Sequence, residues 1–279
     1  MTMLQVTVLA IIQGLTEFLP VSSSAHLILP YQLLGWPDQG LAFDVAVHVG
    51  TLLAVICYYL ADLVKIGTYT IESILTGRVS PVGRVGFCLI IASIPVGIAG
   101  FFLEDFVSTA ARSIELIAYT TIAYGLLLGL ASYVNRHLLW RNILNMEGER
   151  PDTLRHVNYQ QAIIIGLAQA LAIIPGTSRS GITMTAGLFL GLRPEAAARF
   201  SFLLSIPVIL ASGCLEGYKF FTTDDPNVTF GIQMLLGGAI AFFVSMAVIH
   251  LFMKFIAKSG MGIFVIYRVL LGALLLWIF

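Results

Sequence analysis

The sequence predicts an all-α polytopic membrane protein, and three observations support that fold class. Apolar residues make up 58% of the 279 residues, whereas Asp, Glu, Lys and Arg together make up only 11%. A soluble globular protein carries about 25% charged residues, so this chain has too few polar side chains to cover a water-exposed surface. The mean hydropathy is +0.93, and the apolar residues gather in long stretches separated by a few Pro-, Ser- and Gly-rich breaks.

Charge and cysteine usage exclude several other classes. Fifteen basic residues balance fifteen acidic ones, so net charge gives no reason to expect nucleic acid as a partner. The three cysteines lie in apolar stretches without metal-ligand or disulfide spacing. The first ten residues contain no Lys or Arg, so we expect the first apolar segment to be retained and not cleaved as a signal peptide.

Six stretches are long enough to cross a bilayer, since a spanning helix needs about 20 mostly apolar residues. They are 41–60, 85–103, 114–134, 200–218, 230–253 and 262–279.

Two further apolar segments are interrupted by polar breaks. Residues 4–19 run into Pro20 and three serines, and residues 160–174 run into a Pro-Gly-Thr-Ser-Arg-Ser-Gly segment that begins at Pro175. Proline stops a helix, and backbone that leaves the helix at membrane depth must be buried in protein or line a cavity. We therefore predict two re-entrant helical hairpins, whose returning helices are 25–34 and 182–192.

Loop charge predicts the orientation of the chain. The loops 61–84, 135–158 and 254–260 are basic, whereas 104–113 and 219–227 are rich in acidic residues. The positive-inside rule places the first three loops in the cytoplasm and the last two outside. With six crossings, both termini lie outside, and the two hairpins enter the membrane from opposite faces.

Hairpins of opposite orientation indicate an inverted-topology repeat within one membrane domain, 1–279. The first repeat covers about 1–134 and the second about 159–279, and 135–158 is the cytoplasmic connection. A short echo agrees, because Ser-Ile-Pro-Val occurs at residue 93 and again at residue 205. In proteins of this kind the site lies near the midplane, where broken helices of the two halves meet.

The first break carries residues suited to chemistry on an anion. Gln13 and Glu17 are four residues apart and share a helix face, and a carboxylate at membrane depth is costly unless it is partnered or functional. Ser22 and Ser23 precede His26, which lies one turn into the returning helix. That helix also begins with free N–H groups, which suit a phosphate.

The second break carries complementary groups. Arg179 offers a planar donor fork that matches phosphate oxygens. Hydroxyls and glycines that could contact a ligand surround it: Gly176, Ser178, Ser180, Gly181 and Thr183. A carboxylate, a Ser–His pair and an arginine together indicate phosphoryl transfer.

Each of these residues also has a purely structural explanation. Glu17 and Arg179 could form a structural ion pair, the serines could satisfy backbone groups freed at the break, and His26 could be a hydrogen-bonded bundle residue. His48, with Asp44 one turn before it, could line the mouth of the site. Arg268 in the last helix needs an acidic or carbonyl partner.

At these breaks the sequence resembles the bacterial undecaprenyl-diphosphatase family, also named for bacitracin resistance. The shared motifs are Gln13-Gly-Leu-Thr-Glu17, Pro20-Val-Ser-Ser-Ser-Ala-His26 and Pro175-Gly-Thr-Ser-Arg-Ser-Gly-Ile-Thr183. The similarity continues through Phe200–Pro207 and Ile266–Arg268, so it covers most of the chain.

The resemblance implies hydrolysis of undecaprenyl diphosphate to the monophosphate, which recycles the lipid carrier of cell-wall synthesis. It also implies a multi-pass protein of the bacterial inner membrane, a site open to its outer face, a homodimer, and a divalent cation (Mg²⁺, with Ca²⁺ or Mn²⁺ as alternatives). It assigns catalytic or phosphate-binding roles to Glu17, Ser23, His26, Ser178, Arg179 and Thr183. Gln13 takes the amide option of the first motif, so a metal held by Glu17 and Gln13 has one carboxylate fewer.

We expect Ser23, deprotonated by His26, to attack the terminal phosphorus. In a competing version, His26 is itself the nucleophile or the base for a water. The rival functional class is a transporter or flippase of polyprenyl phosphate, since broken helices in inverted repeats are also transporter architecture.

Overall fold

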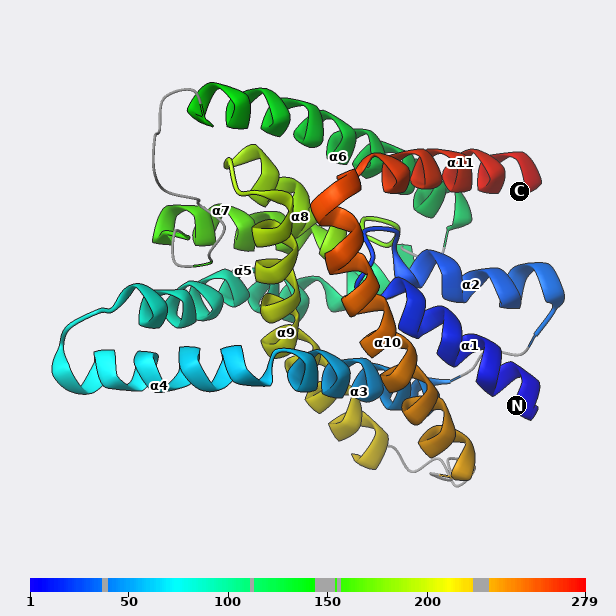
Figure 1. Ribbon diagram of the computed structural model, residues 1–279. Helices are drawn as coiled ribbons and strands as arrows, with labels where there is room; N and C mark the ends of the chain where they lie inside the picture. Colours follow the sequence, from blue (N-terminus) through cyan, green and yellow to red (C-terminus); the bar gives the residue numbers. More distant parts are fainter. Residues whose placement is uncertain (37–39, 111–112, 144–153, 155–156, 223–230) are drawn as a thin grey trace.

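The structure, a computed structural model, describes all residues except 37–39, 111–112, 144–153, 155–156 and 223–230 (Figure 1). The regular secondary structure of the described residues is helical, which confirms the predicted all-α class. In chain order the elements are α1 (Met3–Thr16), α2 (Ser23–Leu34), α3 (Leu41–Tyr58), α4 (Leu60–Thr76), α5 (Pro81–Ala110), α6 (Ile114–Ile143), α7 (Tyr159–Ala170), the 3₁₀ turn η2 (Leu171–Ile173), α8 (Arg179–Phe189), α9 (Pro194–Thr222), α10 (Ile232–Ser259) and α11 (Gly262–Ile278).

Within the described residues, four helices are long and apolar enough to cross a membrane. These segments are Pro81–Leu103 in α5, Ile114–His137 in α6, Pro194–Leu215 in α9 and Ile232–Ser259, the whole of α10. A fifth candidate is the pair of α3 and α4, which is bent by 75°. The last helix, α11, is apolar but has only 17 residues. A membrane protein is therefore supported, while the count of six crossings stays a prediction.

One predicted loop is wrong. Residues 61–84 were expected to be a cytoplasmic loop, yet most of them form α4. This helix is amphipathic, and most of its apolar residues lie on an exposed face: Val64, Ile71 and Ile74 are at least 59% exposed. Ile66, Thr70 and Ser73 are buried, and Asp62 and Lys65 interrupt the apolar sequence. A search for continuous apolar stretches does not detect such a helix, because its apolar residues lie on one face and are not consecutive.

The other four predicted loops are shorter than expected, because α5 continues to Ala110, α6 to Ile143, α9 to Thr222 and α10 to Ser259. Much of the remaining loop charge, including Arg150, Arg155 and Asp224–Asp225, lies outside the described residues. The predicted orientation of the chain therefore stays a prediction.

Both predicted helix–break–helix segments are present. The helix α1 ends at Thr16 and α2 begins at Ser23, while α7 and η2 end at Ile173 and α8 begins at Arg179. The four helices have 14, 12, 12 and 11 residues, fewer than a bilayer crossing requires.

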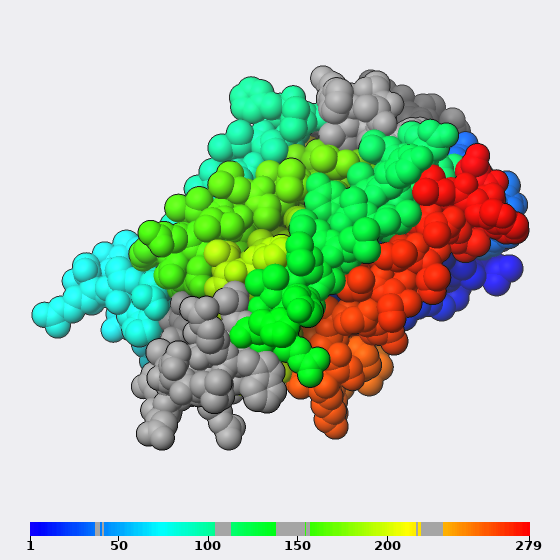
Figure 2. Space-filling model, turned by 90° about the horizontal axis from the view of Figure 1, so that it is seen from above, coloured from blue at the N-terminus to red at the C-terminus, as the bar shows by residue number. Residues whose placement is uncertain are grey.

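Each broken segment packs against a long helix from the other half of the sequence. The first helix, α1, contacts α10, and α7 contacts α5. Glycine allows both close approaches: a Cβ on Gly14 would lie 2.8 Å from the Val244 side chain, and one on Gly166 would lie 2.6 Å from the Ala92 carbonyl oxygen. The C-terminal helix α11 lies alongside α6 across one face of the molecule (Figure 2). The fold therefore cannot be divided into two separately packed halves.

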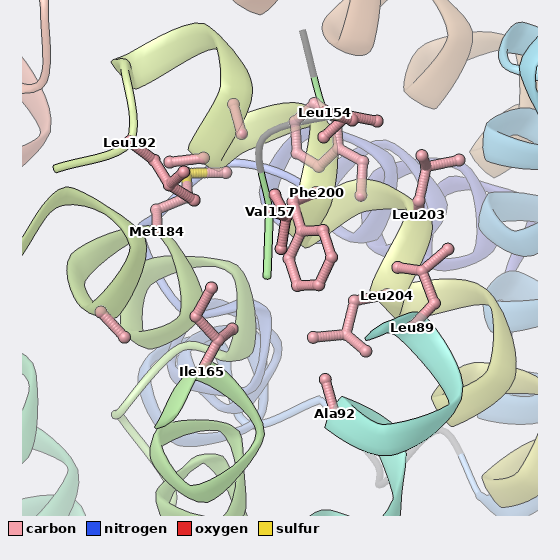
Figure 3. Packing of buried hydrophobic residues seen from close by; sticks show 14 of the residues in the cluster. Leu89, Ala92, Leu154, Val157, Ile165, Met184, Leu192, Phe200, Leu203 and Leu204 are labelled. Atoms are coloured by element: carbon pink, nitrogen blue, oxygen red, sulfur yellow. The ribbon is translucent and has the colours of Figure 1, made fainter. Parts of the chain in front are cut away.

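The hydrophobic core lies around α9, which passes through the middle of the bundle (Figures 1 and 3). Phe200, Leu203 and Leu204 of α9 are at most 1% exposed. They belong to one cluster with Leu89 of α5 and Ile165 of α7 (Figure 3). Because the core joins elements of both halves, it holds the two breaks at fixed positions in the centre of the molecule.

Candidate active site

The two breaks share an unusual backbone conformation. Ser22 has φ of 73° and Ser178 has φ of 68°, and among the described residues they are the only non-glycine residues with positive φ. Each is the N-cap of the returning helix. Such strained residues persist only where the surrounding structure enforces them, and they concentrate at functional sites.

Several side chains near the first break have a counterpart near the second break, always the same number of residues later in the sequence. Ser22 and Ser24 have hydroxyls 3.1 Å apart, and Ser178 and Ser180 have hydroxyls 3.2 Å apart. At the same offset, Thr2 and Asn158 cap α1 and α7 in capping boxes. The fully buried glutamines Gln13 and Gln169 also correspond.

Glu17 is the centre of the candidate site. Its side chain is 8% exposed. One carboxylate oxygen, Oε2, accepts hydrogen bonds from Gln13 Nε2 and Ser23 Oγ, each at 3.0 Å. The other, Oε1, accepts a hydrogen bond from the Arg179 guanidinium at 2.8 Å. His48 Nε2 lies 4.0 Å from Oε2, so the residue that the sequence placed at the mouth of the site lies beside the carboxylate.

The ion pair between Glu17 and Arg179 joins the two breaks across 162 residues of sequence. Ser180 adds a second connection, because its hydroxyl donates to the carbonyl of Leu19 at 2.8 Å. The structure thus brings the predicted carboxylate, serine and arginine together at one place. The ion pair between Glu17 and Arg179, which the sequence analysis gave as a structural alternative, is therefore part of the candidate site.

The predicted pair of Ser23 and His26 is not among the contacts of the described residues. Ser23 donates to Glu17, whereas His26 Nδ1 lies 2.6 Å from the carbonyl oxygen of Ser22, one turn earlier. The other ring nitrogen, Nε2, lies 2.5 Å from the hydroxyl of Tyr267 on α11. The base nearest to the Ser23 hydroxyl is therefore the Glu17 carboxylate.

Three residues predicted to bind substrate at the second break have structural partners. The Ser178 hydroxyl accepts from the Gly181 N–H at 3.1 Å and so caps α8. The Thr183 hydroxyl lies 2.6 Å from that of Ser201 on α9. A Cβ on Gly176 would lie 2.1 Å from Thr120 Oγ1. These three residues fix the position of Arg179, the charged group of this break.

Arg268 connects both breaks to the rest of the bundle. It is fully buried and donates to four backbone carbonyls. Its partners are Pro20 of the first break at 3.3 Å, Gly176 and Thr177 of the second break at 2.8 and 3.0 Å, and Thr121 of α6 at 3.1 Å. The sequence predicted either an acidic or a carbonyl partner for Arg268. All four hydrogen bonds are to carbonyls.

Tyr267 is the residue that sequence reasoning missed. It precedes Arg268 and contributes both a hydroxyl and a stacked ring to His26, with ring centroids 5.6 Å apart and an interplanar angle of 6°. The sequence offered one signal: a tyrosine next to an arginine in an otherwise apolar helix. A Tyr hydroxyl in such a helix usually forms a hydrogen bond.

Gln13 and Glu17 offer oxygen atoms that a divalent cation could bind. The Oε1 atom of Gln13 is buried and has no hydrogen-bond partner among the described residues, and the amide nitrogen of the same side chain contacts Glu17. An amide oxygen beside a carboxylate suits Mg²⁺, which is commonly held by one or two carboxylates together with substrate phosphates. The described residues contain no group of three or more His, Cys, Asp or Glu placed to hold a metal, so these donors fit a cation whose coordination the substrate completes.

Comparison with known proteins gives two findings. The family model described as "Bacitracin resistance protein BacA" matches residues 6–274. A curated protein of Hahella chejuensis (strain KCTC 2396), described as undecaprenyl-diphosphatase, is 49% identical over 281 residues, which cover 100% of this chain and 99% of that protein.

Proposed function

The chain belongs to the bacitracin resistance protein BacA family, and we propose that it hydrolyses undecaprenyl diphosphate to undecaprenyl phosphate and inorganic phosphate. This activity recycles the lipid carrier for cell-wall synthesis and fits the bacitracin resistance for which the family is named. One observation carries the assignment of the site: the Glu17 carboxylate binds the Ser23 hydroxyl on one side and the Arg179 guanidinium of the other break on the opposite side.

Ser23 is the nucleophile in the first step. Its Oγ attacks the terminal phosphorus, its proton passes to Glu17, and the bond between that phosphorus and the bridging oxygen breaks. Undecaprenyl phosphate leaves, and the phosphoryl group remains on Ser23. Arg179 provides donors for the non-bridging oxygens. When the phosphate engages Arg179, Glu17 loses part of its ion pair and becomes a stronger base.

Water completes the reaction in a second step. The water attacks the phosphorus on Ser23, the P–Oγ bond breaks, Glu17 returns its proton to the Ser23 oxygen, and inorganic phosphate leaves. A base must accept a proton from this water. We assign this role to His26, the histidine of the first break. The hydrogen bonds of the two residues support these roles, because Ser23 donates to Glu17 and His26 has no contact with the serine hydroxyl among the described residues.

A divalent cation belongs to the proposal, with Glu17 and Gln13 as the residues that would hold it. When bound, such an ion stabilises negative charge on phosphate oxygens. The buried, unpartnered Oε1 of Gln13 supports this placement.

The finer architecture is also part of the proposal: six crossings, two re-entrant hairpins and an inverted repeat in the bacterial inner membrane, with the site open to the outer face. The matching backbone of Ser22 and Ser178 and the exchanged packing of α1 on α10 and α7 on α5 support the repeat. The polyprenyl tail would remain in the lipid beside the helices, and a homodimer is the expected assembly.

Phosphate release from undecaprenyl diphosphate by the purified protein in detergent tests the function. We expect release by the wild type, its loss in EDTA, and recovery on addition of Mg²⁺, Ca²⁺ or Mn²⁺. Ser23→Ala should lower kcat by about 10³-fold or more, because removing a nucleophile abolishes the covalent route.

Ser24→Ala is the matched control, since it removes a neighbouring hydroxyl that pairs with Ser22 and not with Glu17. Its kcat should stay within about threefold of the wild type, the range expected for an exposed hydroxyl outside the reacting set. If the wild type releases no phosphate with any of the three ions, the hydrolase is excluded, and transport of polyprenyl phosphate becomes the better assignment.

A further inference from the structure

The hydrogen bonds of His26 determine which ring nitrogen can accept a proton. Nδ1 lies 2.6 Å from the backbone oxygen of Ser22. A carbonyl oxygen only accepts hydrogen bonds, so Nδ1 carries the hydrogen, and in the neutral ring Nε2 carries the lone pair. His26 therefore presents Nε2 as its basic atom.

The atom that meets this lone pair is the hydroxyl oxygen of Tyr267. It lies 2.5 Å from Nε2. Because Nε2 has no hydrogen to give, the tyrosine O–H donates and the imidazole accepts. The two rings are also nearly parallel, with an interplanar angle of 6°, so stacking and hydrogen bonding hold the imidazole in the same orientation.

The position of Tyr267 relative to the breaks is fixed by its neighbour. Arg268 binds carbonyls of Pro20 and Gly176, one from each break. Tyr267 itself is 42% exposed, so one side of the phenol faces away from the protein interior. Tyr267 is thus anchored through the backbone of α11, and its side chain is not enclosed in the bundle.

We propose that Tyr267 is a catalytic residue that relays a proton from the attacking water to His26. In the second step the water O–H gives its proton to the Tyr267 oxygen while the Tyr267 O–H gives its proton to His26 Nε2. The water oxygen bonds to phosphorus, the P–Oγ bond to Ser23 breaks, and the Ser23 oxygen takes back from Glu17 the proton that it gave up in the first step. Tyr267 ends neutral, His26 ends as a cation, and its extra proton later returns to solvent. This inference rests on the proposed phosphatase function.

The alternative path, in which water contacts His26 directly, requires Tyr267 to leave its hydrogen bond. The Ser23 hydroxyl does not compete for Nε2, since it donates to Glu17. The relay uses the contact that exists and needs no side chain to move.

Tyr267→Phe tests the relay, because it removes the hydroxyl and keeps the stacked ring. We expect kcat to fall by about 10- to 100-fold, at the low end of general acid–base contributions because a water can fill the space of the lost hydroxyl. KM should stay within about twofold, since this hydroxyl acts in the second step and not in substrate binding.

Tyr58→Phe is the matched control. Tyr58 also pairs its hydroxyl with a histidine, His250 Nδ1 at 3.4 Å, but this pair joins α3 to α10 away from the breaks. Its kcat should equal that of the wild type. Because wild type and control report phosphate release independently of Tyr267, failure of the relay and failure of the phosphatase function give different results.

A double-mutant cycle with His26→Ala separates the relay from a general structural effect. If Tyr267 acts through His26, Tyr267→Phe has no further effect on kcat once His26 is gone. A structural defect would lower kcat by the same factor in both backgrounds and would overturn the proposal. Wild-type or increased kcat in Tyr267→Phe would overturn it as well.

Discussion

The two breaks have similar backbones and different chemistry. At matched positions both have a positive-φ serine and a paired serine hydroxyl. The residue between the paired serines differs: it is Ser23 in the first break and Arg179 in the second. The position of His26 is taken by Ile182, and that of Glu17 by Ile173.

This difference shows how one local structure serves two roles. In the proposed mechanism the first break holds the nucleophile and the bases, and the second supplies the positive charge. Neither break is complete alone, because Glu17 would lack its cation and Arg179 its carboxylate. The shared backbone positions both helix N-termini, while in the proposed mechanism a few side chains determine which part of the reaction each break serves.

Of the variants that compare the two breaks, Arg179→Ala should give the largest effect, and it tests whether the second break does more than support the first. We expect kcat/KM to fall by about 10²- to 10³-fold, the loss typical of removing one group that stabilises transition-state charge. Arg179→Lys should retain part of the activity, because it keeps the charge but loses the bidentate fork. Phosphate release across a range of substrate concentrations measures both variants.

Arg199→Ala is the control for charge loss. Arg199 pairs with Asp62 on α4, and both side chains are about one third exposed, at 34% and 27%. Near-wild-type activity in Arg179→Ala would mean that the second break is only a scaffold.

Arg268→Met tests whether one residue holds the two breaks together. The variant leaves four carbonyls without their donor, and we expect the free energy of unfolding to fall by about 3 kcal/mol, given 1–3 kcal/mol for each buried unsatisfied group and partial relaxation. Unfolding of detergent-solubilised protein by heat or denaturant measures this loss.

Arg199→Met provides the comparison, because a partly exposed ion pair contributes at most about 1 kcal/mol. Equal losses in the two variants would contradict the role assigned to Arg268.

The smallest effect distinguishes the two N-cap serines. Ser178 accepts a hydrogen bond from the Gly181 N–H, whereas the side chain of Ser22 makes no cap bond. We expect Ser178→Ala to cost about 1 kcal/mol and Ser22→Ala a few tenths, because only the first loses a cap. Thermal unfolding of the two variants side by side checks the order, and the reverse order would show that the breaks differ in another way.

The sequence predicted the class of the fold and the two breaks, because composition and Pro, Gly and Ser punctuation are local signals. It also assigned Glu17, Ser23 and His26 to the first break and Arg179 to the second, and the structure brings Glu17, Ser23 and Arg179 into contact. It did not predict α4, whose apolar residues lie on one helix face and not in one continuous stretch.

The pairing of His26 could not be predicted either. Ser23 and His26 lie three residues apart on α2, which favours a contact between them. In the structure the imidazole instead binds the carbonyl of Ser22 and the hydroxyl of Tyr267, 241 residues away. Such a choice depends on which distant helix packs nearby, and no local pattern records that.

The long-range pairing across the bundle also constrains how the chain is made. During translation Glu17 enters the translocon 162 residues before Arg179. At about 5–20 residues per second the ribosome needs about 10–50 s to extend the chain from His26 to Tyr267. For most of that time α1 has no α10 to pack on, and until Arg179 is synthesised the carboxylate has no cation. The nascent α1–α2 segment therefore waits without its packing partner, and a chain that ends before α11 lacks the Arg268 hydrogen bonds that connect the two breaks.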